Sequence, residues 1–160
     1  MPDTNKTKKT LVLIPNYLGV KHPDALLPVY YNKNLQGIEL IFCESFKNAD
    51  TLLSRQNLPM IELFEVNEHS KWNKVENEVM MLLATKNRVG ILSDAGLPCI
   101  ADPGERVVSL AHSLGYEIEV LPGANSMVLA LAASGLNGEL FRFGGYVPID
   151  VGECKRVVVE

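Results

Sequence analysis

The stretch from Val89 to Gly104, VGILSDAGLPCIADPG, constrains the fold more than any other part of the chain. Its first four residues are apolar and run directly into turn-forming residues, which is typical of a strand buried on both faces of a parallel sheet. After the loop, Asp102 is predicted to cap a helix with Pro103 in its first position, and Glu105 completes a capping-box pattern. Ligands of open α/β sheets bind outside the carboxyl ends of the strands, so Ser93 to Gly104 is predicted to form a ligand site.

The rest of the chain alternates strand-like and helix-like segments. Besides 89–92, strands are predicted at 10–15, 38–43, 61–66 and 117–121, and helices at 24–31, 48–56, 71–86, 103–114 and 127–133. The segment 61–66 alternates apolar and acidic residues, which indicates a strand near a sheet edge. Trp72, Met80 and Met81 are predicted to be core residues, and the helix at 127–133 is apolar almost all round and is therefore predicted to be buried.

Strands and helices that alternate this regularly imply right-handed βαβ crossovers. The predicted fold class is α/β, with a mainly parallel five-stranded sheet and helices on both faces. The chain of 160 residues is long enough for one well-filled domain, or for one domain and the beginning of another.

Composition argues against several classes of protein. No apolar run reaches the roughly 18 to 20 residues of a membrane span, and the polar N-terminus lacks the apolar core of a signal peptide, so a cytoplasmic location is expected. The net charge of −4 gives no general attraction for nucleic acid. An odd number of cysteines without a CxxC motif, and histidines far apart, argue against a disulfide framework and against a metal site. These residues are Cys43, Cys99, Cys154, His22, His69 and His112.

The common catalytic and nucleotide-binding motifs GxSxG, GxxxxGK[ST] and GxGxxG are absent from the expected places. What remains is a set of short polar turns at successive strand ends: Asn16 to Gly19, Glu44 and Ser45, Ser93 to Gly104, and Pro122 to Ser126. Glycines allow a ligand to approach the backbone closely, and carboxylates accept hydrogen bonds from hydroxyl and amine groups. The pattern favours a small polar ligand that carries an amine, a ribose and an adenine.

Two longer segments, which contain the last two of these turns, resemble a known protein family. ILSDAGLPCIADPGERVV, followed by EVLPGANSMVLALAASGLNGELFRFGGYVP, resembles the tetrapyrrole methylase superfamily, which uses S-adenosyl-L-methionine, and within it the branch of the 16S ribosomal RNA (cytidine 2′-O) methyltransferases. The resemblance is strongest from Val89 to Pro148. The segments Leu13 to Gly19 and Phe42 to Lys47 match more loosely.

The resemblance implies a methyltransferase that binds S-adenosyl-L-methionine in a cleft between two α/β domains. It implies that the loops after the first, fourth and fifth strands line the cofactor site, with residues Asn16, Leu18, Gly19, Ser93, Asp94, Ala95, Gly96, Pro122, Gly123, Ala124, Asn125 and Ser126. Methyl transfer needs mainly an aligned acceptor and a water-free site, and Glu44 is the candidate catalytic residue near that acceptor. The implied partners are ribosomal RNA or the small ribosomal subunit and a second copy of the chain, with no membrane and no metal.

The chain departs from the family in its first loop, where Asn16, Tyr17, Leu18 and Gly19 replace the usual threonine-proline-x-glycine turn. Residues 1–9 are predicted to be a flexible N-terminus, 10–145 the methylase-like domain, and 146–160 a linker and the start of an absent or truncated second domain. Two alternatives therefore stay open. One is a non-catalytic or truncated methylase-fold domain that acts as a ligand-binding or dimerisation module, and the other is a methylase of a tetrapyrrole or another small molecule.

Overall fold

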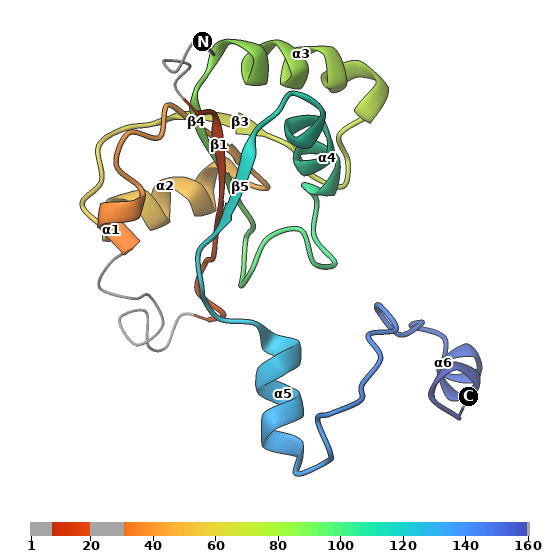
Figure 1. Cartoon of the computed structure of the whole chain (residues 1–160). Helices are drawn as coiled ribbons and strands as arrows, with labels where there is room; N and C mark the ends of the chain where they lie inside the picture. Colours follow the sequence, from red (N-terminus) through yellow and green to blue (C-terminus); the bar gives the residue numbers. More distant parts are fainter. Residues whose placement is uncertain (1–7, 20–30, 160) are drawn as a thin grey trace, which may run out of the picture. The chain divides into compact units, whose positions relative to one another are not determined.

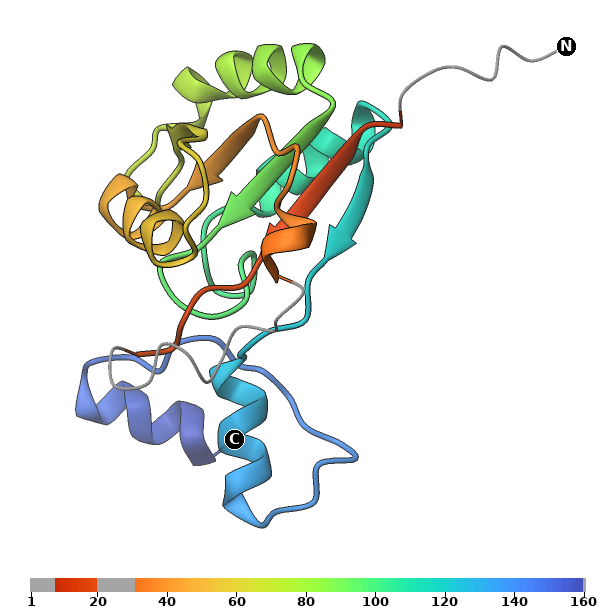
Figure 2. The same cartoon turned by 90° about the vertical axis from the view of Figure 1, so that its left-hand side faces the viewer.

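The computed structural model describes residues 8–19 and 31–159, and these form a sheet of five parallel strands (Figure 2). The strands lie in the order β3-β2-β4-β1-β5 across the sheet. This arrangement confirms the predicted fold class. The strands are β1 Thr10–Ile14, β2 Leu40–Cys43, β3 Glu62–Glu65, β4 Arg88–Leu92 and β5 Glu117–Val120.

Helices cover both faces of the sheet because the first two crossovers, from β1 to β2 and from β2 to β3, run toward one edge, and the last two, from β3 to β4 and from β4 to β5, run toward the other. The helices of this unit are α1 Tyr31–Asn34, α2 Phe46–Arg55, α3 Trp72–Thr85 and α4 Glu105–Ser113. Figure 1 shows α1 and α2 on one side of the sheet and α4 on the other. Alternate side chains of β1 point to opposite faces of the sheet. Val12 and Ile14 pack in the same core cluster as Leu52 of α2, whereas Leu11 packs in the same cluster as Val79 of α3. The predicted helix at 24–31 and His22 lie outside the described residues, apart from Tyr31.

The burial of each strand follows its place in the sheet. The three central strands β2, β4 and β1 are buried over almost their whole length, whereas β3 and β5 at the two edges carry exposed glutamates. The edge position predicted for 61–66 is confirmed. Acidic side chains on edge strands also discourage further strands from adding to the sheet.

The prediction that Met80 and Met81 belong to the core is wrong. Their side chains are 39% and 69% exposed, while Val79 and Leu83 are fully buried. Successive helical residues are rotated by about 100° around the axis, so the two methionines turn away from the face that carries Val79 and Leu83.

The chain divides into two compact units, one through Ser126 and one from Met127. The helices of the second unit are α5 Ser126–Ser134 and α6 Val151–Val159. The predicted burial of 127–133 is wrong, because none of the residues of α5 is buried. The second unit therefore does not bury the apolar side chains of α5. Within the described residues, no helix is both long enough and apolar enough to cross a membrane.

Candidate functional site

The strand order singles out one point along the edge where the strands end. The connection that leaves β2 runs to β3 at one edge of the sheet, whereas the connection that leaves its neighbour β4 runs to β5 at the other edge. Such a switch point is the usual ligand site of an open α/β sheet. Glu44 follows β2, and Ser93 and Asp94 follow β4, so these three residues lie at the switch point.

Asn16 joins the loop after β1 to the loop after β4. Its side-chain Nδ2 donates to the carbonyl oxygens of Ser93 and Asp94 at 3.0 and 3.1 Å, and its backbone N–H donates to the carbonyl of Gly96 at 2.8 Å. Its Oδ1 accepts from the backbone N–H of Tyr17 at 2.8 Å. The side chain is only 5% exposed, so this amide is used within the protein and tethers the two loops.

The loop after β5 packs against both of these loops. A Cβ atom added to Gly96 would lie 3.0 Å from Leu18 Cδ2 and 3.3 Å from the carbonyl oxygen of Ala124. A Cβ added to Gly123 would overlap the ring of Pro15. The structure therefore brings together the three loops that the sequence predicted to form one site. A side chain at Gly123 would overlap the Pro15 ring, and a side chain at Gly96 would crowd Leu18 and Ala124 at a φ of 70° that favours glycine.

Glu44 is linked directly to the fourth-strand loop. Its Oε2 accepts a hydrogen bond from the backbone N–H of Asp94 at 2.9 Å. Burial raises the pKa of the half-buried Glu44 carboxyl, and the carboxylates of Asp94, Asp102 and Glu68 raise it further, while the hydrogen bond from Asp94 opposes the rise. The switch point thus concentrates negative charge.

The prediction that Asp102 caps a helix is wrong. Helix α4 begins at Glu105, and its N-cap residue is Gly104. Gly104 has a φ of 128°, and no side chain makes a capping hydrogen bond at this helix start. Asp102 instead lies near the carboxylates of Asp94 and Glu44. Burial raises the pKa of Asp102, a hydrogen bond with the Ser93 side chain opposes that rise, and the Asp94 carboxylate adds to it. Asp102 lies within the stretch Ser93 to Gly104 that the sequence predicted to form a ligand site, but the sequence favoured a capping role for this residue over a role in binding.

Two residues of the loop between β4 and α4 have a left-handed backbone conformation. Cys99 and Ala101 have φ values of 68° and 61°, which are uncommon for residues with a side chain and concentrate at functional loops. Burial and the carboxylates of Asp102 and Glu105 raise the pKa of the Cys99 thiol to about 11. The thiol is therefore protonated at neutral pH, as a packing role requires.

The other predicted residues differ in how they are placed. Ala95, Pro122 and Gly123 are exposed beside the buried Ser93 and Gly96, so a ligand can reach the loops there. Asp94, Leu18, Ala124 and Asn125 are half-buried, Gly19 is exposed at the end of its described segment, and Ser126 is exposed as the first residue of α5.

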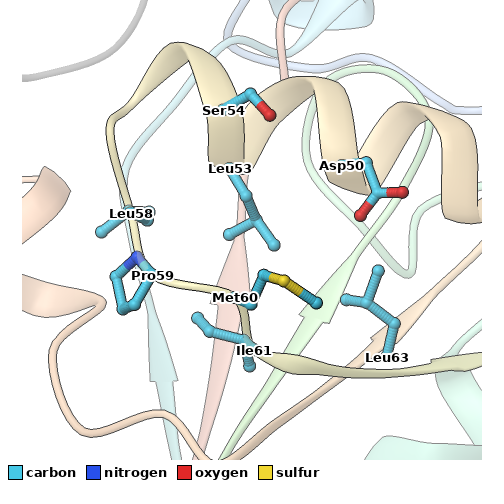
Figure 3. A pocket seen from close by; sticks show the side chains of 8 residues that line it. All are labelled: Asp50, Leu53, Ser54, Leu58, Pro59, Met60, Ile61 and Leu63. Carbon is cyan, nitrogen blue, oxygen red and sulfur yellow. The ribbon is translucent and has the colours of Figure 1, made fainter.

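A separate depression of about 280 Å³ lies between α2 and β3 (Figure 3). Its lining is mostly apolar and includes Leu53, Met60 and Leu63, together with the polar residues Asp50 and Ser54 of α2. None of the predicted site residues lines it. In the part of the chain that the structure describes, no cluster of three or more His, Cys, Asp or Glu side chains is placed to hold a metal ion.

Comparison with known proteins agrees with this architecture. The family profile described as tetrapyrrole (corrin/porphyrin) methylases matches residues 25–142, which is well over half of the chain. The chain belongs to the tetrapyrrole methylase family. The match contains the loops after β2 and β4 and the turn after β5, whereas the loop after β1 with Asn16 lies before it.

Several relatives of the chain carry the same name. Proteins named ribosomal RNA small subunit methyltransferase I are 33% identical in Rickettsia prowazekii over 126 residues and 33% identical in Thermotoga maritima over 116 residues. These alignments cover 79% and 72% of this chain, but 44% and 51% of the relatives. A Streptococcus pyogenes protein of the same name is 29% identical over 94% of this chain and 50% of its own length. The chain thus spans about half the length of the curated relatives it matches.

Proposed function

We propose that this chain binds S-adenosyl-L-methionine and takes part in methyl transfer to RNA of the small ribosomal subunit, with the 2′-oxygen of a cytidine as acceptor. The observation that carries the proposal is the convergence of three loops at the carboxyl ends of β1, β4 and β5, in a chain that belongs to a methylase family. The names of the relatives support ribosomal RNA as the substrate. A ribosomal RNA substrate places the reaction in the cytoplasm.

The residues at the loops suit this cofactor. The small residues Ala95, Gly96 and Gly123 leave the backbone open to a ligand, and Asp94 offers a half-buried carboxylate to hydroxyl and amine donors. Negative charge at the switch point favours a molecule that carries an ammonium and a sulfonium group. When bound, S-adenosyl-L-methionine supplies an electrophilic methyl group.

The chain's own contribution to the reaction is positional. Converging loops hold the reacting groups in one orientation, and burial of Asn16 and Ser93 beneath the site excludes water from one side. Glu44, at the adjoining strand end, stays the predicted polar residue near the acceptor.

Titration calorimetry with S-adenosyl-L-methionine and its demethylated product tests the proposal. The wild-type chain is expected to bind both, and Asp94→Ala to weaken binding by about tenfold or more, the usual size for losing a hydrogen bond to a charged group. Where binding is found, transfer of labelled methyl to small-subunit RNA, mapped by nucleotide, tests the acceptor. No heat and no thermal stabilisation of the wild type at millimolar ligand would leave the alternative of a non-catalytic methylase-fold module.

Helix α5 supports the further proposal that two copies of the chain associate. Val128 and Leu129 are each 52% exposed on this apolar helix. Apolar side chains that gather on a surface mark protein interfaces, and two-fold pairing of like chains is the commonest way to cover them.

Light scattering during gel filtration is expected to give the mass of a dimer at micromolar concentration. Leu129→Glu should shift the mass toward the monomer, because an acidic side chain is costly in an apolar interface. Met81→Glu is the matched control, since Met81 is 69% exposed on α3 in the other unit. A wild-type chain that stays monomeric at all accessible concentrations would contradict the proposal.

A further inference from the structure

Both polar groups of the Asp94 main chain are held by side chains from other strand ends. The N–H of Asp94 donates to Glu44 Oε2 at 2.9 Å, and the carbonyl oxygen of Asp94 accepts from Asn16 Nδ2 at 3.1 Å. The same Nδ2 also donates to the carbonyl oxygen of Ser93 at 3.0 Å. The main-chain N–H and carbonyl groups of Asp94, in the predicted cofactor loop after β4, are therefore both held by hydrogen bonds.

The strand order makes this double restraint possible. Asp94 follows β4, which lies between β2 and β1 in the sheet. Glu44 follows β2 on one side, and Asn16 follows β1 on the other. Each flanking strand therefore supplies one side chain, and the two side chains reach Asp94 from opposite directions across the end of β4.

The chemistry of the two contacts is complementary. Glu44 supplies a hydrogen-bond acceptor and Asn16 a donor, which are the two functions that one peptide unit needs. The contact with Glu44 requires an oxygen atom at that position, but it does not require a charge. The amide oxygen of glutamine supplies the same acceptor with the same side-chain length.

We propose that Glu44 and Asn16 are positioning residues, which fix the main chain of Asp94 so that its side chain faces the cofactor. The proposal rests on the cofactor-binding function proposed above. It assigns Glu44 a different role from the catalytic one predicted from the sequence. A catalytic base must lose or gain a proton during the reaction, whereas a positioning acceptor only has to stay in place.

The pair of variants Glu44→Ala and Glu44→Gln separates these roles. In the ligand-free protein, Glu44→Ala is expected to speed amide hydrogen exchange of Asp94 by about tenfold, as loss of one hydrogen bond to a charged group predicts. It should also weaken binding of S-adenosylhomocysteine about tenfold. Glu44→Gln should keep both quantities within about threefold of the wild type. The amide of the fully buried Val12, in strand β1, reports any change in global stability.

Several results would overturn the proposal. Exchange of Asp94 that is as slow in Glu44→Ala as in the wild type would show that Glu44 does not restrain the loop. A Glu44→Gln variant that binds normally but no longer supports methyl transfer would show a catalytic base. If the wild type binds no S-adenosylhomocysteine, the proposed function fails, while the exchange of Asp94 still decides whether Glu44 holds the loop.

Discussion

Replacing Asn16 with aspartate is expected to destabilise the protein by about 3 kcal/mol near neutral pH, because it buries a charge against two acceptors. The two side chains have the same shape, but aspartate presents an oxygen where Nδ2 now donates to the carbonyls of Ser93 and Asp94. At 5% exposure, water cannot replace the lost donors. Cofactor binding should be lost together with the loop arrangement.

The effect of Asn16→Asp should depend on pH. A carboxyl group that faces two carbonyl oxygens is more stable when it is protonated, so its folded-state pKa lies above its unfolded value. The loss of stability is therefore expected to grow as pH rises above about 4, the ordinary pKa of aspartate. It should shrink on acidification, because the protonated group can donate one hydrogen bond. Urea unfolding of variant and wild type at pH 5 and pH 7 measures the difference.

Asn137→Asp is the matched control for Asn16→Asp. Asn137 is exposed, and its Oδ1 accepts from the backbone N–H of Glu139 at 2.9 Å, which a carboxylate oxygen does equally well. Its stability should stay within about 0.5 kcal/mol of the wild type. Equal losses in the two variants would show that the tether between the first and fourth loops contributes nothing specific.

Replacing Gly123 with alanine is the second change with a large expected effect. The added methyl group would overlap Cβ and Cγ of Pro15, and a proline ring cannot rotate away as a flexible side chain can. The turn after β5 must therefore move away from the loop after β1. We expect a cost of about 1 to 3 kcal/mol from overpacking and a loss of affinity for S-adenosyl-L-methionine of at least about tenfold.

Gly144→Ala is the control for Gly123→Ala, because a Cβ atom at Gly144 would meet nothing within 4 Å. Thermal unfolding and calorimetric titration of the two variants measure stability and affinity separately. Normal affinity in Gly123→Ala would mean that the cofactor does not depend on contact between the first and fifth loops, and the three-loop site would have to be redrawn.

Local pattern was sufficient to predict most of the elements. Apolar runs such as 89–92 that end in turn residues predicted the strands, and the acidic alternation at 61–66 placed β3 at an edge. The three loops that meet around Gly96 were also predicted as a set. These predictions succeed because they depend on side-chain periodicity and on the rule that parallel strands end at one edge of the sheet.

The local patterns failed where more than one outcome was compatible with them. Asp102 followed by Pro103 and Glu105 matches a capping box, but the left-handed residues Cys99 and Ala101 lead into a turn in which Gly104 precedes the helix. Helix α5 is apolar enough to be buried, but burial also requires a neighbour. Neither outcome is encoded in the residues of the segment alone.

Residue patterns along the chain were enough to predict most of the elements, the loops that carry polar residues and the family resemblance. The roles of those polar residues depend on the three-dimensional arrangement of the strands. Asn16 reaches partners 77 and 78 residues away, and Glu44 reaches one 50 residues away. These contacts exist because β4 lies between β2 and β1, and the order of strands in a sheet depends on crossovers between distant segments, which no local pattern records.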